Sequence, residues 1–129
     1  MAQLVGRAFL ACRIGEADAL LIAFDQDADY DSPNFLWFRE RFARFVYIDR
    51  VVVDARARGR GLARALYEEL FARARLAGHT IVVCEVNAEP ANPVSDAFHA
   101  ALGFAEIGSA VLAENAKVVR YFSRPLPPL

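Results

Sequence analysis

At 129 residues and 14.3 kDa, the chain has the length of one domain, because single hydrophobic cores commonly span about 100 to 200 residues. Lys and Arg total 15 against 16 for Asp and Glu, so no net basic charge predicts binding to nucleic acid or to an anionic membrane. The hydrophobic fraction of 56% excludes disorder and predicts one packed domain over residues 1–129.

The first half of the chain predicts three strands. Two short apolar runs, 4–14 and 19–24, are separated by a polar turn and fit an antiparallel hairpin. Residues 25–34 are polar and contain the turn signal Ser32-Pro33-Asn34, which predicts a loop. The β-branched and aromatic run 45–53 predicts a central strand.

The second half predicts two helices among three further strands. Apolar residues recur at helical spacing over 62–77, and Gly78 suits the left-handed position after such a helix. Residues 80–86 predict a strand, and a second helix follows with Asn92 as its cap, Pro93 at its first position and Gly103 at its end. Residues 104–112 and 118–123 then predict a terminal hairpin. The expected order is therefore three strands, helix, strand, helix and two strands.

Charged and aromatic residues are unevenly distributed. Ten of the fourteen arginines lie between Arg39 and Arg75, whereas 16–31 holds six acidic residues and no basic one. This pattern fits either an anion-binding and a cation-binding end or two solvated faces. Seven of the fifteen aromatic residues fall within 30–47, where we expect most to be core and some to line a substrate pocket or a dimer contact.

No sequence signal indicates a membrane span, a secretory leader or a metal centre. No apolar run approaches the roughly 20 residues that cross a bilayer, and the N-terminus lacks signal-peptide features, so we expect a cytoplasmic protein. Cys12 and Cys84 have no Cys or His at metal-ligand spacing. We therefore expect two buried free thiols and no metal.

The most informative segment is a strand that enters a helix through a turn with two glycines, Gly59 and Gly61. The first N–H groups of a helix lack internal partners and lie at the positive end of its dipole, which favours phosphate binding. A dinucleotide-binding fold would need a third glycine, and a Walker motif would need Gly-Lys-Ser or Gly-Lys-Thr. The turn therefore predicts a phosphate site of another kind.

The run Arg56-Ala57-Arg58-Gly59-Arg60-Gly61 resembles the R/Q-x-x-G-x-G/A acyl-CoA signature of the GNAT N-acetyltransferase superfamily. Asn92 and Leu102-Gly103-Phe104 resemble the later motif of that family, an Asn before a short helix that ends in Leu-Gly-Phe. The resemblance covers residues 14–122. It implies an α/β (α+β) fold with a mixed, mostly antiparallel twisted sheet flanked by helices, and acyl-CoA bound at the strand, turn and helix.

The resemblance also implies a set of residues that bind acetyl-CoA. Backbone N–H groups of the turn would hold the pyrophosphate, from Arg58 through Gly59, Arg60, Gly61 and Leu62 to Ala63. Arg56 and Arg58 would add positive charge. The main chain from Val51 to Val53 would pair with the pantetheine arm, with an N–H near Val53 polarising the thioester carbonyl, and Asn92 would contact the cofactor.

Amine acetylation requires a neutral amine and a proton for the leaving thiolate. Presenting a lysine-like amine in its neutral form at pH 7 costs about 4–5 kcal/mol, and an α-amine about 1 kcal/mol. Glu85 resembles the glutamate that acts as base in some GNAT members, and its apolar neighbours favour a raised pKa. Its alternative role is to position substrate or pair with an arginine. Asp49 is a second candidate base, with an ion pair to an arginine as its alternative role.

The proton donor departs from the family pattern. His99 stands where the family often has a tyrosine acid, and histidine can donate a proton near neutral pH. The alternatives are a packing or capping histidine with water as donor, and Tyr30 and Tyr121 are lesser candidates. The usual first strand and two helices also have no counterpart in the residues before the predicted hairpin, so we expect a shortened acceptor site and a homodimer that covers the open sheet edge.

These expectations favour an acetyl-CoA-dependent N-acetyltransferase that acts on a primary amine, either small or peptidic, by direct attack. A second hypothesis is a non-catalytic GNAT-fold module that binds acyl-CoA without turnover. A third is a simple phosphate or nucleotide binder that uses the glycine turn. Acceptor identity and acyl chain length stay open at this point.

Overall fold

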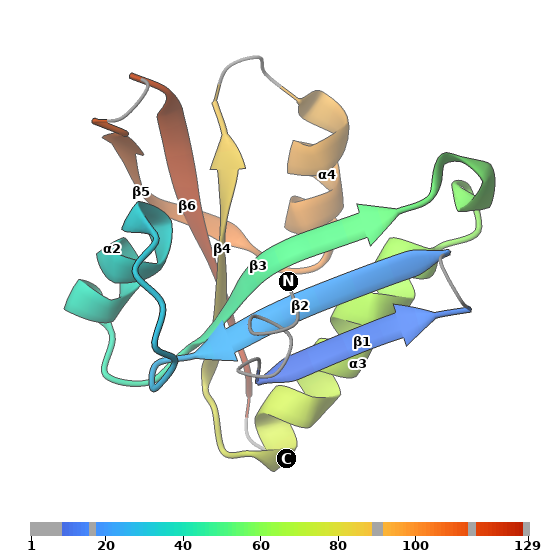
Figure 1. Cartoon of the computed structure of the whole chain (residues 1–129), viewed down its shortest axis with the longest axis horizontal. Helices are drawn as coiled ribbons and strands as arrows, with labels where there is room; N and C mark the ends of the chain where they lie inside the picture. Colours follow the sequence, from blue (N-terminus) through green and yellow to red (C-terminus); the bar gives the residue numbers. More distant parts are fainter. Residues whose placement is uncertain (1–8, 16–17, 89–91, 114–115, 128–129) are drawn as a thin grey trace.

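The computed structural model describes residues 9–15, 18–88, 92–113 and 116–127 (Figure 1). Its strands are β1 (Leu10–Ile14), β2 (Ala19–Asp25), β3 (Val46–Val53), β4 (Ile81–Asn87), β5 (Ala105–Val111) and β6 (Val118–Pro125). Its helices are α2 (Pro33–Arg41), α3 (Leu62–Leu76), α4 (Pro93–Ala101) and the short 3-10 helix η1 (Ala55–Ala57). Residues 4–8 of the first predicted strand lie outside the described residues.

The strands form one six-stranded sheet in the order β1-β2-β3-β4-β6-β5. Every neighbouring pair is antiparallel except β3 and β4, which are parallel and joined through η1 and α3. A parallel pair needs such a crossover, which places the glycine turn at the end of β3. The predicted mixed, mostly antiparallel sheet is therefore confirmed.

One helix was missed by the sequence prediction. The predicted loop 25–34 and the unassigned residues after it contain α2, which lies between β2 and β3. Ser32 caps this helix, since its Oγ accepts a hydrogen bond from Phe35 N at 3.2 Å, and Pro33 occupies the first helical position. Ser32 and Pro33, which the sequence predicts to form a turn, therefore begin a helix.

Helices cover both faces of the sheet. On one face α3 and α4 pack over a core that includes Leu66, Leu70 and Val82. On the other face α2 inserts Phe35 and Phe38 between the rings of Phe45, Tyr47 and Tyr121. Burial of each such side chain contributes about 1.5–3 kcal/mol. The aromatic segment is thus mainly core, as expected.

The sheet opens between its two parallel strands. β3 and β4 are in register only at Val46 with Val82 and Tyr47 with Val83, after which they diverge. Figure 1 shows β3 and β4 spreading apart, with α4 beside the opening. The backbone groups along the diverging halves have no ladder partner in the neighbouring strand, so this opening is the place where the fold can admit a ligand.

Candidate active site

Two pockets meet at the opening between β3 and β4. The larger has a volume of about 450 Å³, and the smaller, of about 340 Å³, lies at the glycine turn. Val53, Ala63 and Phe98 line both pockets, so the two pockets adjoin between the glycine turn and the opening of the sheet.

The turn holds both glycines in the left-handed region. Gly59 has a φ of 83° and Gly61 a φ of 71°, values that cost an L-amino acid about 1–2 kcal/mol. A Cβ atom added at either position would meet no atom within 4 Å. The requirement for glycine is therefore conformational, and the space above both residues is open to a ligand.

The N-terminus of α3 has no side-chain cap. Gly61 is its N-cap residue, and the first helical hydrogen bond runs from Ala65 N to Gly61 O at 3.0 Å. The N–H groups of Leu62, Ala63 and Arg64 precede that bond and have no partner within the helix. They carry the positive end of the helix dipole at the wall of the smaller pocket, which suits a phosphate group.

Most of the predicted cofactor residues line one or both of the two pockets. Val53, Arg58, Gly59, Gly61, Leu62 and Ala63 line the smaller pocket, and Val51, Val53, Ala63 and Asn92 line the larger one. The side chains of Arg56 and Arg60 have protein partners instead. Arg56 Nε lies 3.5 Å from Asp54 Oδ1, and Arg60 Nη2 lies 3.4 Å from Asp18 Oδ2.

Glu85 of β4 lines the larger pocket, and its carboxylate contacts Tyr47 of β3 and Asn34 of α2. Its Oε1 accepts two hydrogen bonds, from Tyr47 OH at 2.9 Å and from Asn34 Nδ2 at 3.2 Å. Its Oε2 is buried and has no hydrogen-bond partner among the described residues. A buried carboxylate oxygen without a partner is costly, so this atom is the natural contact for a polar ligand.

Burial is the main influence on the acidity of Glu85. Desolvation, with a smaller contribution from the charge of Asp49, raises its pKa to about 7. The hydrogen bonds from Tyr47 and Asn34 act in the opposite direction. A pKa near neutrality lets Glu85 exchange a proton at physiological pH, as a general base must.

Asp49 lies in the same pocket at an irregularity in β3. Ile22 pairs with Arg50 and Ala23 with Ile48, which leaves Asp49 as the extra residue of a β-bulge. Its Oδ1 accepts a hydrogen bond from Tyr30 OH at 2.7 Å. Burial and this carboxylate raise the pKa of Tyr30 to about 12, so Tyr30 stays protonated as the donor.

His99 lies on α4 at the other wall of the larger pocket. Its Nδ1 is 2.8 Å from the Ser95 carbonyl oxygen, and its Nε2 is 2.9 Å from the hydroxyl of Tyr67 on α3. Because a carbonyl oxygen only accepts, Nδ1 carries the hydrogen, and Tyr67 donates to Nε2 of the neutral ring. Burial raises the pKa of Tyr67, which keeps that hydroxyl protonated.

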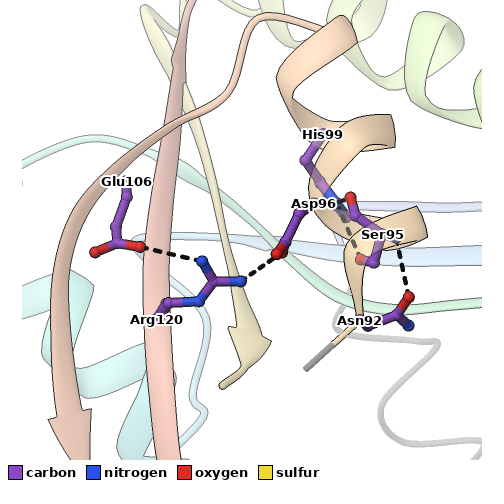
Figure 2. A network of polar contacts seen from close by, with 6 residues as sticks. All are labelled: Asn92, Ser95, Asp96, His99, Glu106 and Arg120. Atoms are coloured by element: carbon purple, nitrogen blue, oxygen red, sulfur yellow. Dashed lines mark hydrogen bonds and ion pairs between the residues drawn. The ribbon is translucent and has the colours of Figure 1, made fainter. Parts of the chain in front are cut away.

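Two sets of contacts fix α4 beside the pocket (Figure 2). Asn92 caps the helix, as predicted, because its Oδ1 accepts from Ser95 N at 3.1 Å. Arg120 of β6 bridges Asp96 of α4 and Glu106 of β5. The helix that carries His99 is therefore tied to the sheet at its N-terminal half.

Sequence reasoning did not find Asn34, Tyr47 or Tyr67. Asn34 belongs to the missed helix, and Tyr47 was counted only as a core aromatic residue. Tyr67 falls on the apolar stripe of α3, where spacing alone favours a core role. The sequence offers one signal for a functional role of Tyr67: its hydroxyl lies on an otherwise apolar helix face, and a buried tyrosine hydroxyl needs a hydrogen-bond partner.

The cysteines, the acidic and histidine side chains and the helices of the described residues were each predicted to lack a disulfide, a metal site or a membrane span. Cys12 and Cys84 are both free, and burial raises the pKa of Cys84, so its thiol stays protonated. No group of three or more His, Cys, Asp or Glu side chains among them is arranged to hold a metal ion. None of the helices in this part of the chain has the length and apolar character needed to cross a membrane.

Comparison with known proteins identifies the same architecture. The sequence model of the acetyltransferase (GNAT) family matches residues 17–104. The ribosomal-protein-S18-alanine N-acetyltransferase of Escherichia coli is similar over 99% of this chain and 76% of its own, with a TM-score of 0.68 and 19% identity. No curated protein matches the chain significantly.

Two other similar structures contain the expected cosubstrate. A candidate acetyltransferase of Salmonella typhimurium, solved with its cofactor acetyl-CoA, aligns with 85% of this chain and 58% of its own, at a TM-score of 0.59 and 20% identity. A candidate streptothricin acetyltransferase of Bacillus anthracis, in complex with acetyl coenzyme A, aligns with 85% and 56%, at a TM-score of 0.63 and 17% identity. The chain thus spans little more than half the length of these two proteins.

Proposed function

The chain belongs to the acetyltransferase (GNAT) family, and from this premise we propose that it transfers the acetyl group of acetyl-CoA to a primary amine. One observation carries the proposal. Two adjoining pockets extend from the uncapped N-terminus of α3 to Glu85, whose buried Oε2 atom has no hydrogen-bond partner among the described residues. The helix N-terminus suits the phosphate groups of the acetyl donor. The carboxylate, with a pKa near 7, suits an amine acceptor that has to lose a proton.

The glycine turn fits the donor. The N–H groups at the start of α3 would hold the pyrophosphate, and the space above Gly59 and Gly61 admits it. Val51 and Val53, on the half of β3 that diverges from β4, would face the pantetheine arm. Acetyl-CoA supplies an activated thioester, so the protein has to orient the two substrates and move protons.

Glu85 is the proposed base. Oε2 accepts the proton that an ammonium group must lose before attack, directly or through one water. For a lysine-like amine this removal costs about 4–5 kcal/mol at pH 7, and for an α-amine about 1 kcal/mol. A base is therefore most useful for the first class. The α-amine of a peptide is the other candidate acceptor. It is supported by the similar Escherichia coli enzyme, which is named for an alanine of a ribosomal protein.

His99 is the proposed proton donor to the leaving thiolate. The only N–H of its neutral ring is held by the Ser95 carbonyl, so the transferable proton is the one at Nε2 of the protonated ring. Tyr67 is hydrogen-bonded to that nitrogen and can pass the proton into the pocket. In the balanced reaction an ammonium acceptor loses two protons, of which one ends on the thiol and one in solvent.

The test is acetyl-CoA-dependent thiol release with a panel of primary amines, with the acetylated product identified by mass spectrometry. Glu85→Gln is expected to lower turnover and leave acetyl-CoA affinity unchanged. Glu69→Gln, which removes an exposed ion pair to Arg73, is the matched control and is expected to keep full activity. Binding of acetyl-CoA without thiol release for any amine would favour the non-catalytic module.

We further propose that residues 1–129 act as a single acyltransferase domain in the cytoplasm, and that two copies form a homodimer. The dimer proposal rests on the sheet edge at β1, which pairs only with β2 among the described strands. Light scattering at micromolar concentration tests it, and the mass of one subunit would contradict it.

A further inference from the structure

The carboxylate of Glu85 is held in one orientation. Both of its hydrogen bonds reach the same oxygen, Oε1, from opposite elements: Tyr47 OH of β3 at 2.9 Å and Asn34 Nδ2 of α2 at 3.2 Å. The other oxygen, Oε2, is buried and has no partner among the described residues. Because both donors bind Oε1, Oε2 is the carboxylate oxygen that is left to bind a ligand.

Asn34 is itself oriented by a third residue. Its Oδ1 accepts a hydrogen bond from Tyr121 OH of β6 at 2.9 Å. An ionised carboxylate can only accept hydrogen bonds, so the NH₂ end of Asn34 must face Glu85 and the carbonyl end must face Tyr121. The chain of donors therefore runs in one direction, from Tyr121 to Asn34 to Glu85.

The place of Asn34 in α2 makes this orientation rigid. It is the second residue of the helix, directly after Pro33, and Ser32 caps the same turn. One turn further on, Trp37 stacks on the ring of Tyr121 at a centroid distance of 4.1 Å. The helix is thus anchored to the same tyrosine that orients the Asn34 amide.

We propose that Asn34 is a positioning residue for the acetyl-transfer reaction, holding Oε1 of Glu85 so that Oε2 is presented to the acceptor amine. The inference rests on the proposed function, in which Glu85 is the base. It adds a role for α2, the helix that the sequence did not reveal. A displacement of a catalytic group by about 1 Å can lower the rate about a hundredfold, so loss of this orientation should lower the rate of acetyl transfer.

The hydrogen bond also affects the acidity of Glu85. The titratable and charged groups that face Glu85 or share its pocket are Tyr30, Tyr47, Asp49, Arg50, Tyr67, Cys84, His99 and Tyr121. Burial and Asp49 raise the pKa of Glu85, while Tyr47 and Asn34 lower it by stabilising the ionised form. Removal of the Asn34 amide should therefore raise that pKa further.

The experiment compares Asn34→Ala and Asn34→Asp with the parent protein. Asn34→Asp keeps the volume and the acceptor for Tyr121 but replaces the donor with a second carboxylate. Ser32→Ala is the matched control, because it weakens the cap of the same helix without removing a contact to Glu85. Thermal unfolding confirms that each variant is folded.

The primary readout needs no acceptor. The protein is labelled with [¹³C]glutamate at the side-chain carboxyl carbon, and the Glu85 signal is assigned by its loss in Glu85→Gln and followed from pH 4 to 9. We expect a midpoint near 7 in the parent, as the pKa of Glu85 indicates, a higher one in Asn34→Ala and the highest in Asn34→Asp. Ser32→Ala should shift the midpoint less than either Asn34 variant, because it loosens the start of the helix but keeps the Asn34 amide. A midpoint unchanged in both Asn34 variants would overturn the inference.

Turnover provides the second readout. With an amine accepted by the parent protein, Asn34→Ala should lower kcat by about tenfold to a hundredfold while the affinity for acetyl-CoA is kept. Full activity in Asn34→Ala together with loss in Glu85→Gln would overturn the inference and leave the proposed function standing. Full activity in Glu85→Gln would instead reject the base assignment itself.

Discussion

The hydroxyl of Tyr67 on α3 donates a hydrogen bond to Nε2 of His99 on α4 across 2.9 Å, while the carbonyl of Ser95 holds Nδ1 from the other side. Both ring nitrogens are thereby engaged in the neutral form of His99. If His99 is the proton donor, as proposed, the proton leaves from Nε2 of the protonated ring, and Tyr67, which is hydrogen-bonded to that atom, passes it into the pocket. In the proposed mechanism, Tyr67 is therefore as important to proton delivery as His99.

Tyr67→Phe tests this pairing. The substitution keeps the ring packing but leaves Nε2 of the buried His99 without its donor, which should lower the unfolding free energy by about 1–3 kcal/mol. We expect kcat for thiol release to fall by about a hundredfold with the affinity for acetyl-CoA retained. Phe104→Leu, in the same aromatic cluster, should lower stability without that loss of kcat. Unchanged kcat in Tyr67→Phe would exclude it from proton delivery.

The raised pKa of Glu85 predicts a pH dependence of stability. The unfolded state ionises this carboxyl near pH 4.5 and the folded state near 7, so the folded state binds more protons between these values. The contribution of Glu85 to stability is fully present below pH 4.5 and is lost as the pH rises through about 7. The shift corresponds to about 3 kcal/mol.

Urea unfolding of Glu85→Gln and of the parent at pH 4.5 and pH 8 measures this contribution. The glutamine variant does not ionise, so its stability relative to the parent should increase by about 3 kcal/mol between the two pH values. A relative stability that is equal at both pH values would show that Glu85 titrates normally in the folded protein.

Gly61 and Gly78 allow the glycine turn to be tested against a matched site. Both have positive φ, 71° and 84°, but Gly61 lines the smaller pocket whereas Gly78 follows α3 at its far end. Alanine at either position should cost about 1–2 kcal/mol of stability. Only Gly61→Ala should also weaken acetyl-CoA binding, by about tenfold in a calorimetric titration, because the turn relaxes from its binding conformation. Equal affinity in the two variants would argue against the turn as the cofactor site.

Gly108 of β5 gives α2 room to approach the sheet. A Cβ atom at this position would lie 2.7 Å from Cζ2 of Trp37, and Trp37 stacks on Tyr121. Gly108→Ala should therefore destabilise the protein by about 1–3 kcal/mol and displace the indole. Trp37 is the only tryptophan in the sequence, so its fluorescence emission reports the displacement directly. Restored stability in the Gly108→Ala, Trp37→Phe double variant would support the contact, and an unchanged emission in the single variant would contradict it.

The elements predicted correctly from the sequence are those with local signals. The start of α4 follows from Asn92 and Pro93, and the turn before α3 follows from two glycines that need positive φ. The helix α2 was missed because its nine residues are too short for a clear period and its aromatic side chains suit a strand equally well. Its cap, Ser32 before Pro33, carried the local information but also fits a turn.

The site was predicted only in part for a different reason. The residues matched to the family motifs indicated Glu85, His99 and the turn, but no local pattern indicates what they contact. Asn34 and Tyr47 reach Glu85 from 51 and 38 residues away along the chain. Such contacts depend on how the strands and helices pack, and a single sequence does not specify them.

Calorimetric titration with acetyl-CoA, beside desulfo-CoA and ATP, tests acyl-CoA binding at the strand, turn and helix most directly. We predict micromolar binding of both CoA compounds, much weaker binding of ATP, and loss of CoA binding in Gly61→Glu, whose carboxylate would occupy the phosphate site. Absence of CoA binding by the parent protein, or undiminished binding in Gly61→Glu, would contradict the proposed cofactor site.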